Sequence, residues 1–346
     1  MIGRTVHHFG PDPAEVGGMA SVIRVITEHS IGSDDVRFHP TWRWRSRAAT
    51  CRLTLAAACK IVALRRGEIA HVHLSERGSF VREGILIALA RMRGTTAVVT
   101  IHGADFLTFA HSRPRLVVAV LGRSSLITCL DTAVLDYVRR VVPRVRAEML
   151  PNPVPMDETS PPADETSEVI LFAGEIGIRK GADVLLGAWR MIAAARPSAR
   201  CIMVGPANGF TVPEVERLTV RGVVGPNEMQ ALIRSARVVA LPSRAEGMPM
   251  ALTEAMSGGR AFVSTPVGGI PELARSGGVL VPVGDEVELA RCLGMFLDSP
   301  DLAKRLGERA RQYCGETRSV AVIDARLREL YDAARVDALD TRCAPI

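Results

Sequence analysis

The sequence has few aromatic residues and no long hydrophobic run. Phe, Trp and Tyr make up 4% of the 346 residues, so aliphatic side chains must build the core. The longest apolar candidate, Leu53–Leu64, contains Lys60 and is shorter than the roughly 18 residues that a transmembrane helix needs. The first residues, Met1–Val6, enter a strand-like segment without a signal-peptide pattern, which predicts a cytoplasmic protein.

Several metal-binding and nucleotide-binding motifs are also missing. The seven cysteines contain no Cys-x-x-Cys pair, which argues against a zinc site or a disulfide framework and favours reduced thiols. No Gly-x-Gly-x-x-Gly is present, so a dinucleotide-dependent dehydrogenase is disfavoured. The segment Gly174–Gly181 lacks the Gly-Lys-Ser/Thr of a P-loop.

The charge is distributed unevenly along the chain. The formal net charge is +6, but residues 1–150 carry +9 and the remaining residues carry −3. The first half could therefore meet an anionic substrate, a membrane surface or nucleic acid, or could simply present a solvated basic surface. Nucleic acid is not expected as a partner because no recognition motif accompanies the charge.

Short apolar strands alternate with helical patterns twice along the chain, which predicts an α/β protein with two doubly wound, Rossmann-like domains. The first series of expected elements is Thr5–Phe9, Met19–His29, Ala48–Arg65, Ile69–Leu74, Val81–Met92 and Thr95–Ile101. The second series is Val169–Ala173, Ala182–Ala195, Arg200–Val204, Asn227–Ser235, Arg237–Leu241, Pro249–Met256, Ala261–Ser264, Asp285–Leu297 and Ala303–Cys314.

The predicted domains are residues 1–156 and 169–319. Between them, residues 157–168 are acidic, contain proline and show no periodicity, which predicts a linker. A final helical pattern, roughly Val320–Arg335 within residues 320–346, can pack back on the first domain.

The most informative passage is Arg237–Glu272 (RVVALPSRAEGMPMALTEAMSGGRAFVSTPVGGIPE). A strand leads to the turn Glu246-Gly247 and then to a helix that begins near Pro249. The free backbone N–H groups at a helix N-terminus offer a natural site for phosphate. Glu254 lies about 7 Å further along the helix axis, so two carboxylates flank the anion site. A nucleotide sugar, with hydroxyl groups on both sides of a diphosphate, suits this arrangement.

Glu246 and Glu254 in this context resemble the E-x7-E motif of glycosyltransferase family 4. Further segments match the family in the expected order: Gly17-Gly18, Val98–Gly103, Leu150–Asn152, Phe172–Asp183 and Thr265–Glu272. The resemblance covers nearly the whole chain. It implies the GT-B architecture with a central cleft, retention of configuration at the anomeric carbon, and no cofactor or essential metal. The absence of an Asp-x-Asp pair agrees with metal independence.

The resemblance also implies roles for individual residues. Lys180, Glu246 and His102 are the expected catalytic residues; Lys180 would contact the diphosphate and His102 a sugar hydroxyl or the acceptor. Glu254 would bind the ribose. The remaining residues expected at the donor are Gly18, Gly174, Arg179, Gly247, Met248, Pro249 and Met250. The other histidines at strand positions, His7, His8, His71 and His73, are interpreted as strand-edge packing.

One position departs from the family pattern. The family's phosphate loop usually has Arg where this sequence has Glu175. A carboxylate beside a diphosphate is repulsive by ~1–4 kcal/mol at 4 Å for dielectric constants between 80 and 20. Either Glu175 points away or Arg179 supplies the missing charge, and the sequence favours Arg179.

The segment Thr41–Arg47 (TWRWRSR) interleaves tryptophan and arginine before an apolar-rich helix. This pattern suits a membrane interface, with the protein peripheral on the inner face of the membrane and a lipid-linked acceptor. A basic loop before an ordinary core-facing helix explains the same residues.

The expected function is transfer of a sugar from a nucleotide-diphosphate donor to an acceptor hydroxyl of a glycan, a glycolipid precursor or a small molecule. Two alternatives remain. One is a nucleotide-sugar epimerase, and the other is a catalytically weak nucleotide-sugar-binding protein, which the departure from the family pattern at Glu175 supports. The sequence does not specify the base, the sugar, the acceptor, the linkage or the oligomeric state.

Overall fold

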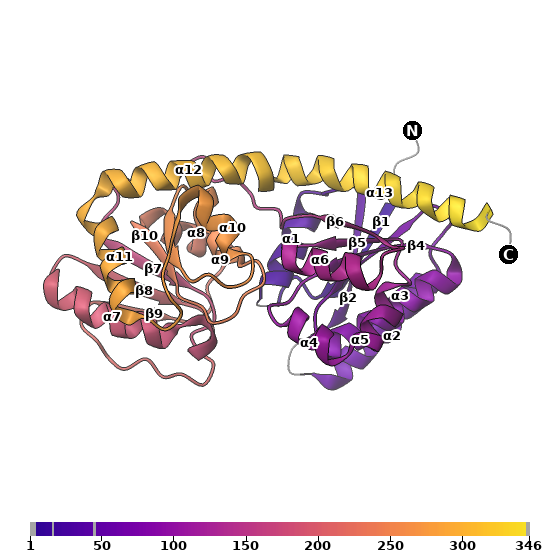
Figure 1. The fold of residues 1–346 in the computed structure, drawn as a ribbon, viewed down its shortest axis with the longest axis horizontal. Coiled ribbons are helices and arrows are strands. Elements are labelled where there is room, and N and C mark those ends of the chain that lie inside the picture. Colours follow the sequence, from indigo (N-terminus) through magenta and orange to yellow (C-terminus); the bar gives the residue numbers. More distant parts are fainter. Residues whose placement is uncertain (1–4, 16, 44–45, 344–346) are drawn as a thin grey trace. The chain divides into compact units, whose positions relative to one another are not determined.

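The computed structural model describes residues 5–15, 17–43 and 46–343, with side chains described as far as residue 335. The chain divides into two compact units (Figure 1). Unit 1 comprises Met1–Pro153 and Val320–Ile346, and unit 2 comprises Val154–Ser319. The chain therefore passes between the units twice, at Pro153–Val154 and at Ser319–Val320.

Unit 1 is built on a parallel sheet of six strands in the order β2-β1-β3-β4-β5-β6. Its strands are β1 (Thr5–Pro11), β2 (Asp35–Trp42), β3 (Ile69–Leu74), β4 (Thr96–Ile101), β5 (Leu126–Cys129) and β6 (Arg146–Met149). Its helices are α1 (Gly18–Glu28), α2 (Arg47–Val62), α3 (Gly78–Arg93), α4 (Phe106–Ser112), α5 (Pro114–Leu121), α6 (Thr132–Val141) and α13 (Val320–Cys343).

The two faces of the unit 1 sheet differ in chemistry. One face carries apolar side chains such as Phe9, Val72 and Val99, which pack in one core with residues of α2, α3 and α5. Side chains alternate between faces along a strand, so the opposite face carries His8, His71, His73 and Thr100. Residues of α1 and α13 cover this polar face.

Helix α13 is fixed to unit 1 by polar and apolar contacts. Asp324 accepts a hydrogen bond of 2.6 Å from the backbone N–H of Gly32. The Tyr331 hydroxyl lies 2.6 Å from Nδ1 of His71 on β3. The last helix thus returns to the first domain, as the sequence allows, and in Figure 1 it runs along the unit 1 sheet.

Unit 2 contains a second parallel sheet of six strands, in the order β12-β11-β10-β7-β8-β9. Its strands are β7 (Val169–Ala173), β8 (Arg200–Val204), β9 (Leu218–Arg221), β10 (Val238–Leu241), β11 (Ala261–Ser264) and β12 (Gly278–Leu280). Its helices are α7 (Ala182–Ala195), α8 (Pro226–Ser235), α9 (Met250–Ser257), α10 (Ile270–Gly277), α11 (Glu286–Asp298) and α12 (Pro300–Arg318), with 3-10 turns η1 (Ala163–Glu165) and η2 (Ile178–Lys180).

The predicted fold class of two Rossmann-like, doubly wound units is confirmed. In unit 2 the six strands, numbered along the chain, follow the 3-2-1-4-5-6 order of dinucleotide-binding folds. In unit 1 the corresponding order is 2-1-3-4-5-6, which places the reversal between β1 and β3. None of the described helices combines the length and the hydrophobicity that a membrane crossing requires.

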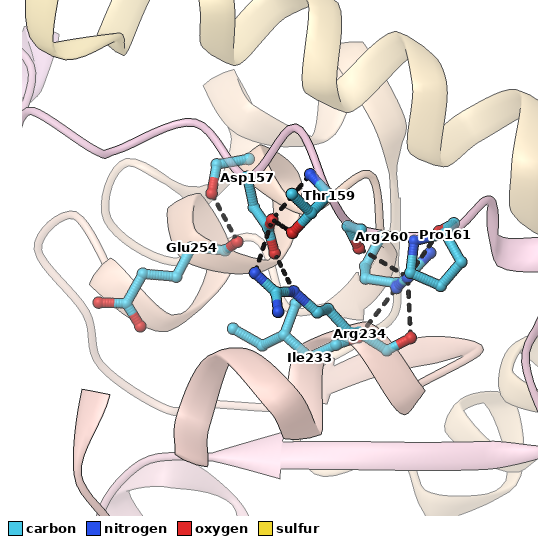
Figure 2. A network of polar contacts seen from close by, with 9 residues as sticks. Asp157, Thr159, Pro161, Ile233, Arg234, Glu254 and Arg260 are labelled. Atoms are coloured by element: carbon cyan, nitrogen blue, oxygen red, sulfur yellow. Dashed lines mark hydrogen bonds and ion pairs between the residues drawn. The ribbon is translucent and has the colours of Figure 1, made fainter. Parts of the chain in front are cut away.

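The segment 157–168, predicted as a linker, packs on unit 2 instead of running free (Figure 2). The buried Asp157 carboxylate accepts hydrogen bonds of 2.8 and 3.0 Å from Arg234 at the end of α8. Ser160 Oγ and Pro161 O each accept a hydrogen bond of 2.8 Å from the buried Arg260. The polar composition predicted a linker, but here the polar groups serve as acceptors for two arginines.

Candidate functional site

The residues with the strongest sequence signal lie at the carboxyl ends of β7 and β10. These two strands are neighbours in the sheet. From β7 the chain continues to β8 on one side of this pair, and from β10 it continues to β11 on the other side. In open α/β sheets, ligands bind at this reversal of strand order. Lys180 follows β7 and Glu246 follows β10, so the topology brings together two residues 66 positions apart in sequence.

Lys180 and Glu246 form a close ion pair. Lys180 Nζ lies 2.5 Å from Oε1 and 2.6 Å from Oε2 of Glu246. The Ser243 hydroxyl donates a further hydrogen bond of 2.7 Å to Glu246 Oε1. Glu246 is only 6% exposed. A buried carboxylate requires such partners, because its transfer from water without them is strongly unfavourable.

Two glycines permit the close approach of the loops around this pair. Gly268 has φ +55°, and a Cβ there would lie 2.1 Å from the carbonyl oxygen of Glu246. Gly181 has φ +74°, and a Cβ there would lie 2.0 Å from the carbonyl oxygen of Pro242. Side chains at these positions would push apart the segments that hold Glu246 and Lys180.

The predicted loop 247–250 is positioned by the turn that follows β11. The backbone N–H of Gly269 donates a hydrogen bond of 2.8 Å to the carbonyl of Gly247. The side chains of Met248, Pro249 and Met250 are buried. Helix α9 then begins after Pro249, and no side chain caps this helix among the described residues. Its first turn can therefore offer backbone N–H groups to an anion.

Glu254 lies on α9, one face of which is buried while Glu254 remains half-buried. Figure 2 shows its carboxylate directed away from the ion pair between Arg234 and Asp157. Its backbone carbonyl accepts a hydrogen bond of 2.9 Å from Ser257 Oγ. Arg260, just beyond α9, donates hydrogen bonds to the carbonyls of Ile233 and Arg234, both at 2.9 Å, and so anchors this end of the segment.

The glycine loop after β7 carries paired charges as well. A Cβ at Gly174 would contact the stem of Lys180 at 4.0 Å, so the predicted loop residue does adjoin the predicted cation. Arg179 Nε lies 3.6 Å from Glu175 Oε1. Glu175 therefore accompanies Arg179, and the role of Arg179 at a diphosphate stays a prediction. The arginine is present but shares its charge with the carboxylate.

Arg244 and Asp183 form another ion pair at this end of the sheet. Both terminal guanidinium nitrogens of Arg244 lie 2.8 Å from the Asp183 carboxylate. The backbone N–H of Arg244 donates a hydrogen bond of 2.8 Å to the backbone carbonyl of Arg179. Ser243, Arg244 and Asp183 were not among the site residues predicted from the sequence. The position of Ser243 and Arg244 directly after the predicted strand Arg237–Leu241 was the available signal.

Two predicted residues belong to unit 1. Gly18 is exposed and is the first residue of α1, preceded by Gly17 at φ +146°. His102 follows β4 and is only 5% exposed, with Nε2 3.0 Å from Nδ1 of His73. Burial lowers the pKa of His102 to about 3, so its imidazole is neutral near pH 7.

Residues 167–299 match the profile of the family described as Glycosyl transferases group 1. This segment contains the Lys180–Glu246 pair and the helix that carries Glu254. The family resemblance predicted from the E-x7-E passage is thereby confirmed.

Curated relatives carry related names. The D-inositol 3-phosphate glycosyltransferase of Streptomyces scabiei is 33% identical over 186 residues, which cover 48% of this chain and 42% of the relative. The MMP alpha-(1->4)-mannosyltransferase of Mycolicibacterium hassiacum is 32% identical over 136 residues, covering 37% of this chain and 33% of the relative. The chain thus spans less than half the length of these relatives in the matched regions.

Solved structures match nearly the whole chain in fold. HepE of Anabaena in complex with UDP-glucose aligns with a TM-score of 0.74 at 16% identity, over 95% of this chain and 99% of that one. Sucrose-phosphate synthase of Thermosynechococcus elongatus aligns with a TM-score of 0.72 at 16% identity, over 95% and 98%. At this identity the likeness concerns the fold, which is the GT-B architecture predicted from sequence.

Proposed function

We propose that this protein is a retaining, metal-independent glycosyltransferase that moves a sugar from a nucleotide diphosphate to an acceptor hydroxyl. The observation that carries the proposal is the Lys180–Glu246 pair at the strand-order reversal of unit 2, beside an uncapped helix N-terminus. The names of the curated relatives support sugar transfer. The UDP-glucose bound by HepE supports a nucleotide-sugar donor.

The ion pair suggests how the donor would be bound. The diphosphate would attract the ammonium group of Lys180, and the oxygens of Glu246 would then accept hydrogen bonds from sugar hydroxyls. Ser243 donates to Glu246 Oε1 and would keep the carboxylate oriented during this exchange. Backbone N–H groups of residues 247–250 and Glu254, the proposed ribose partner, would complete the donor site with Gly174 and Arg179.

In the proposed reaction the bond between the anomeric carbon and the diphosphate oxygen breaks, and a bond to the acceptor oxygen forms on the same face. The acceptor proton passes to the departing phosphate. The leaving group gains negative charge in the transition state, so preorganised positive charge from Lys180 and the α9 N-terminus would stabilise it. No cofactor enters this scheme.

The acceptor side would involve unit 1 with His102, and Gly18 would approach the donor. The basic half of the chain and exposed apolar side chains on neighbouring helices favour a peripheral contact with an anionic membrane at its cytoplasmic face. These side chains include Leu55 on α2, which is 66% exposed, and Met92 on α3, which is 80% exposed. Trp42 ends β2, with Arg82 above its ring, whereas Trp44 and Arg45 lie outside the described residues.

The membrane contact has its own test. Liposomes containing anionic lipid should retain the protein in co-sedimentation, and a Leu55→Gln, Met92→Gln double variant should be released. Equal sedimentation of the double variant and the parent protein would remove this part of the proposal without affecting sugar transfer.

The donor site is tested by thermal unfolding with nucleoside diphosphates and their sugar conjugates, with and without Mg²⁺. A ligand at 100 times its Kd adds about 2.7 kcal/mol to the free energy of unfolding. We expect a shift for one base, independent of Mg²⁺, that is lost in Glu254→Ala and kept in the control Glu228→Ala, whose side chain lies on the surface of α8.

Product analysis separates the alternative functions. A changed sugar nucleotide formed without acceptor would indicate an epimerase. Donor binding without transfer or slow hydrolysis would indicate a binding protein. An inverted anomeric configuration in the product would contradict the retaining mechanism.

A further inference from the structure

A chain of buried histidines connects the interior of unit 1 to His102. His8 on β1 pairs in register with His71 on β3, and His73 pairs with Thr100 on β4, so all four side chains lie on one face of the sheet. The imidazole rings of His71 and His73 stack, with 4.6 Å between their centroids. His102 continues this face just beyond β4. These are interior strands of the sheet, so the interpretation of His8, His71 and His73 as strand-edge packing is wrong.

The hydrogen bonds run in sequence from His8 to His102. His8 Nδ1 lies 2.9 Å from His73 Nε2, and His73 Nδ1 lies 3.0 Å from His102 Nε2. All three side chains are buried, and burial lowers the pKa of each below the usual value of 6.5. A neutral imidazole has one N–H donor and one acceptor nitrogen. The protons in this chain must therefore all point in one direction.

The two directions of the hydrogen-bond chain differ in what they require of His8, at the end opposite to His102. His8 Nε2 is buried and has no hydrogen-bond partner. If the protons pointed toward His8, this atom would be an N–H group without an acceptor, the rarer arrangement for buried polar groups. If they point toward His102, His8 Nε2 is only an unused lone pair. The second direction places an N–H on Nδ1 of His102.

Nδ1 of His102 is where this proton can be used. Within the described part of the chain, this nitrogen has no hydrogen-bond partner, yet it is not among the fully sealed side-chain atoms. It lies at the carboxyl end of β4, the edge of the sheet at which doubly wound folds bind ligands. Its other nitrogen, Nε2, is occupied as the acceptor from His73.

A separate branch on the same face is polarised independently. Thr128 Oγ1 lies 3.4 Å from the carbonyl of Val99 and 2.6 Å from Thr100 Oγ1; donation to the carbonyl, a long contact, leaves Thr100 as the donor to Thr128. Thr100 Oγ1 must then accept the bond of 2.6 Å from His71 Nε2. His71 is thereby the Nε2–H tautomer, with Nδ1 accepting from the Tyr331 hydroxyl.

We propose that His8 and His73 are positioning residues that hold His102 as the neutral Nδ1–H tautomer, so that His102 donates a hydrogen bond to a ligand oxygen and does not act as a base. The ligand oxygen is a sugar hydroxyl or a phosphate oxygen of the donor or acceptor. The identity of this ligand rests on the proposed function, whereas the tautomer does not.

The tautomers are measurable in the free, full-length protein. Long-range ¹H–¹⁵N spectra of histidine-labelled protein distinguish a protonated from an unprotonated ring nitrogen. We expect Nδ1–H for His8, His73 and His102, Nε2–H for His71, and no titration of His102 between pH 5 and 8. An Nε2–H tautomer of His102, or its titration in this range, would overturn the proposal.

Matched variants separate positioning from packing. His73→Phe should allow His102 to exchange between tautomers, and His73→Asn, whose side-chain amide can replace Nδ1–H, should restore Nδ1–H. His71→Phe removes the stacked ring of the other branch and should leave the His102 spectrum unchanged. A change of the His102 tautomer in His71→Phe but not in His73→Phe would contradict the assigned chain.

The same cluster could instead hold a metal, because ring nitrogens of His8, His71 and His73 lie within 4.8 Å of one another. Titration with Zn²⁺ tests this directly. Stoichiometric binding with coordination shifts of all three rings would overturn the hydrogen-bond chain, and unchanged spectra would support it.

Activity supplies the link to function. With donor and acceptor present, His73→Phe should lose about 2- to 10-fold in kcat/KM, the value of one neutral hydrogen bond, and His73→Asn should recover most of it. If transfer itself is absent, the tautomer result still stands, so failure of the proposed function and failure of this inference are distinguishable.

Discussion

Units 1 and 2 are each built on a doubly wound parallel sheet, but the two units differ in where their polar residues lie and whether these residues are charged. In unit 2 the polar groups lie in loops at strand ends and are charged: Lys180 with Glu246, Arg179 with Glu175, and Arg244 with Asp183. In unit 1 they lie on the sheet itself, are buried, and are neutral histidines and threonines. Charged pairs can exchange partners with an ionic ligand, whereas a buried neutral chain fixes the direction of hydrogen bonds.

The largest effect should come from breaking the charged pair of unit 2. Lys180→Ala removes the cation proposed to stabilise the leaving diphosphate, and a loss of about 10²–10³ in kcat is expected, similar to removal of an oxyanion donor. Steady-state transfer kinetics measure this loss. Lys304→Ala, at an ion pair with Asp164 elsewhere in unit 2, is the control and should retain activity. Equal activity of both variants would exclude Lys180 from the reaction.

The next effect concerns stability of unit 2. The fully buried Arg260 donates to Ser160, Pro161, Ile233 and Arg234, and its removal leaves these acceptors unpaired. Arg260→Ala should lower the free energy of unfolding by about 3 kcal/mol, as loss of a buried hydrogen-bonded charge does. Chemical denaturation measures it. A loss below 1 kcal/mol would show that water replaces the guanidinium at little cost.

Acid should affect unit 1 through its neutral histidines. Burial lowers the folded-state pKa of His8 and of His102 to about 3, against 6.5 in the unfolded chain. The unfolded chain therefore binds more protons, so stability is complete above pH 6.5 and falls as the pH drops from 6.5 toward 3.

Each histidine should remove about 1.4 kcal/mol per pH unit in this range. Hydrogen exchange in β1, β3 and β4, compared at pH 7 and pH 5, reports the loss locally. A His8→Phe variant should reduce the pH dependence of this exchange. Protection that is equal at both pH values would show that these histidines are already protonated or accessible.

The smallest effect concerns the paired arginine of the phosphate loop. Glu175→Gln removes the carboxylate 3.6 Å from Arg179 and should tighten binding of a nucleoside diphosphate by about 1 kcal/mol, the Coulomb energy of one exposed charge at this distance. Arg179→Ala should weaken binding by a similar amount. Calorimetric titration measures both. Wild-type affinity in Arg179→Ala would show that the diphosphate does not reach this side chain.

The sequence predicted the interior strands well and the edge strands poorly. The runs Ile69–Leu74, Val169–Ala173 and Ala261–Ser264 were predicted with the bounds that the structure gives them. The edge strands β2, β6, β9 and β12 were not predicted, and neither was the short interior strand β5. β2 contains Arg37, His39 and Pro40, and β9 is largely exposed. Helices cover both faces of an interior strand and so favour apolar residues in it, whereas an edge strand is defined by pairing with one neighbour, which composition does not encode.

The sequence by itself determined the two series of βα units and the family resemblance, and it identified Lys180, Glu246 and Glu254 as candidate residues, because strand periodicity and motif spacing are local properties of the chain. Only the tertiary structure decided which groups face one another. In the structure Lys180 forms an ion pair with Glu246, Glu175 forms one with Arg179, and residues 157–168 pack on unit 2. The structure also joins His8, His73 and His102 into one chain, because the register of three parallel strands places them on a common face.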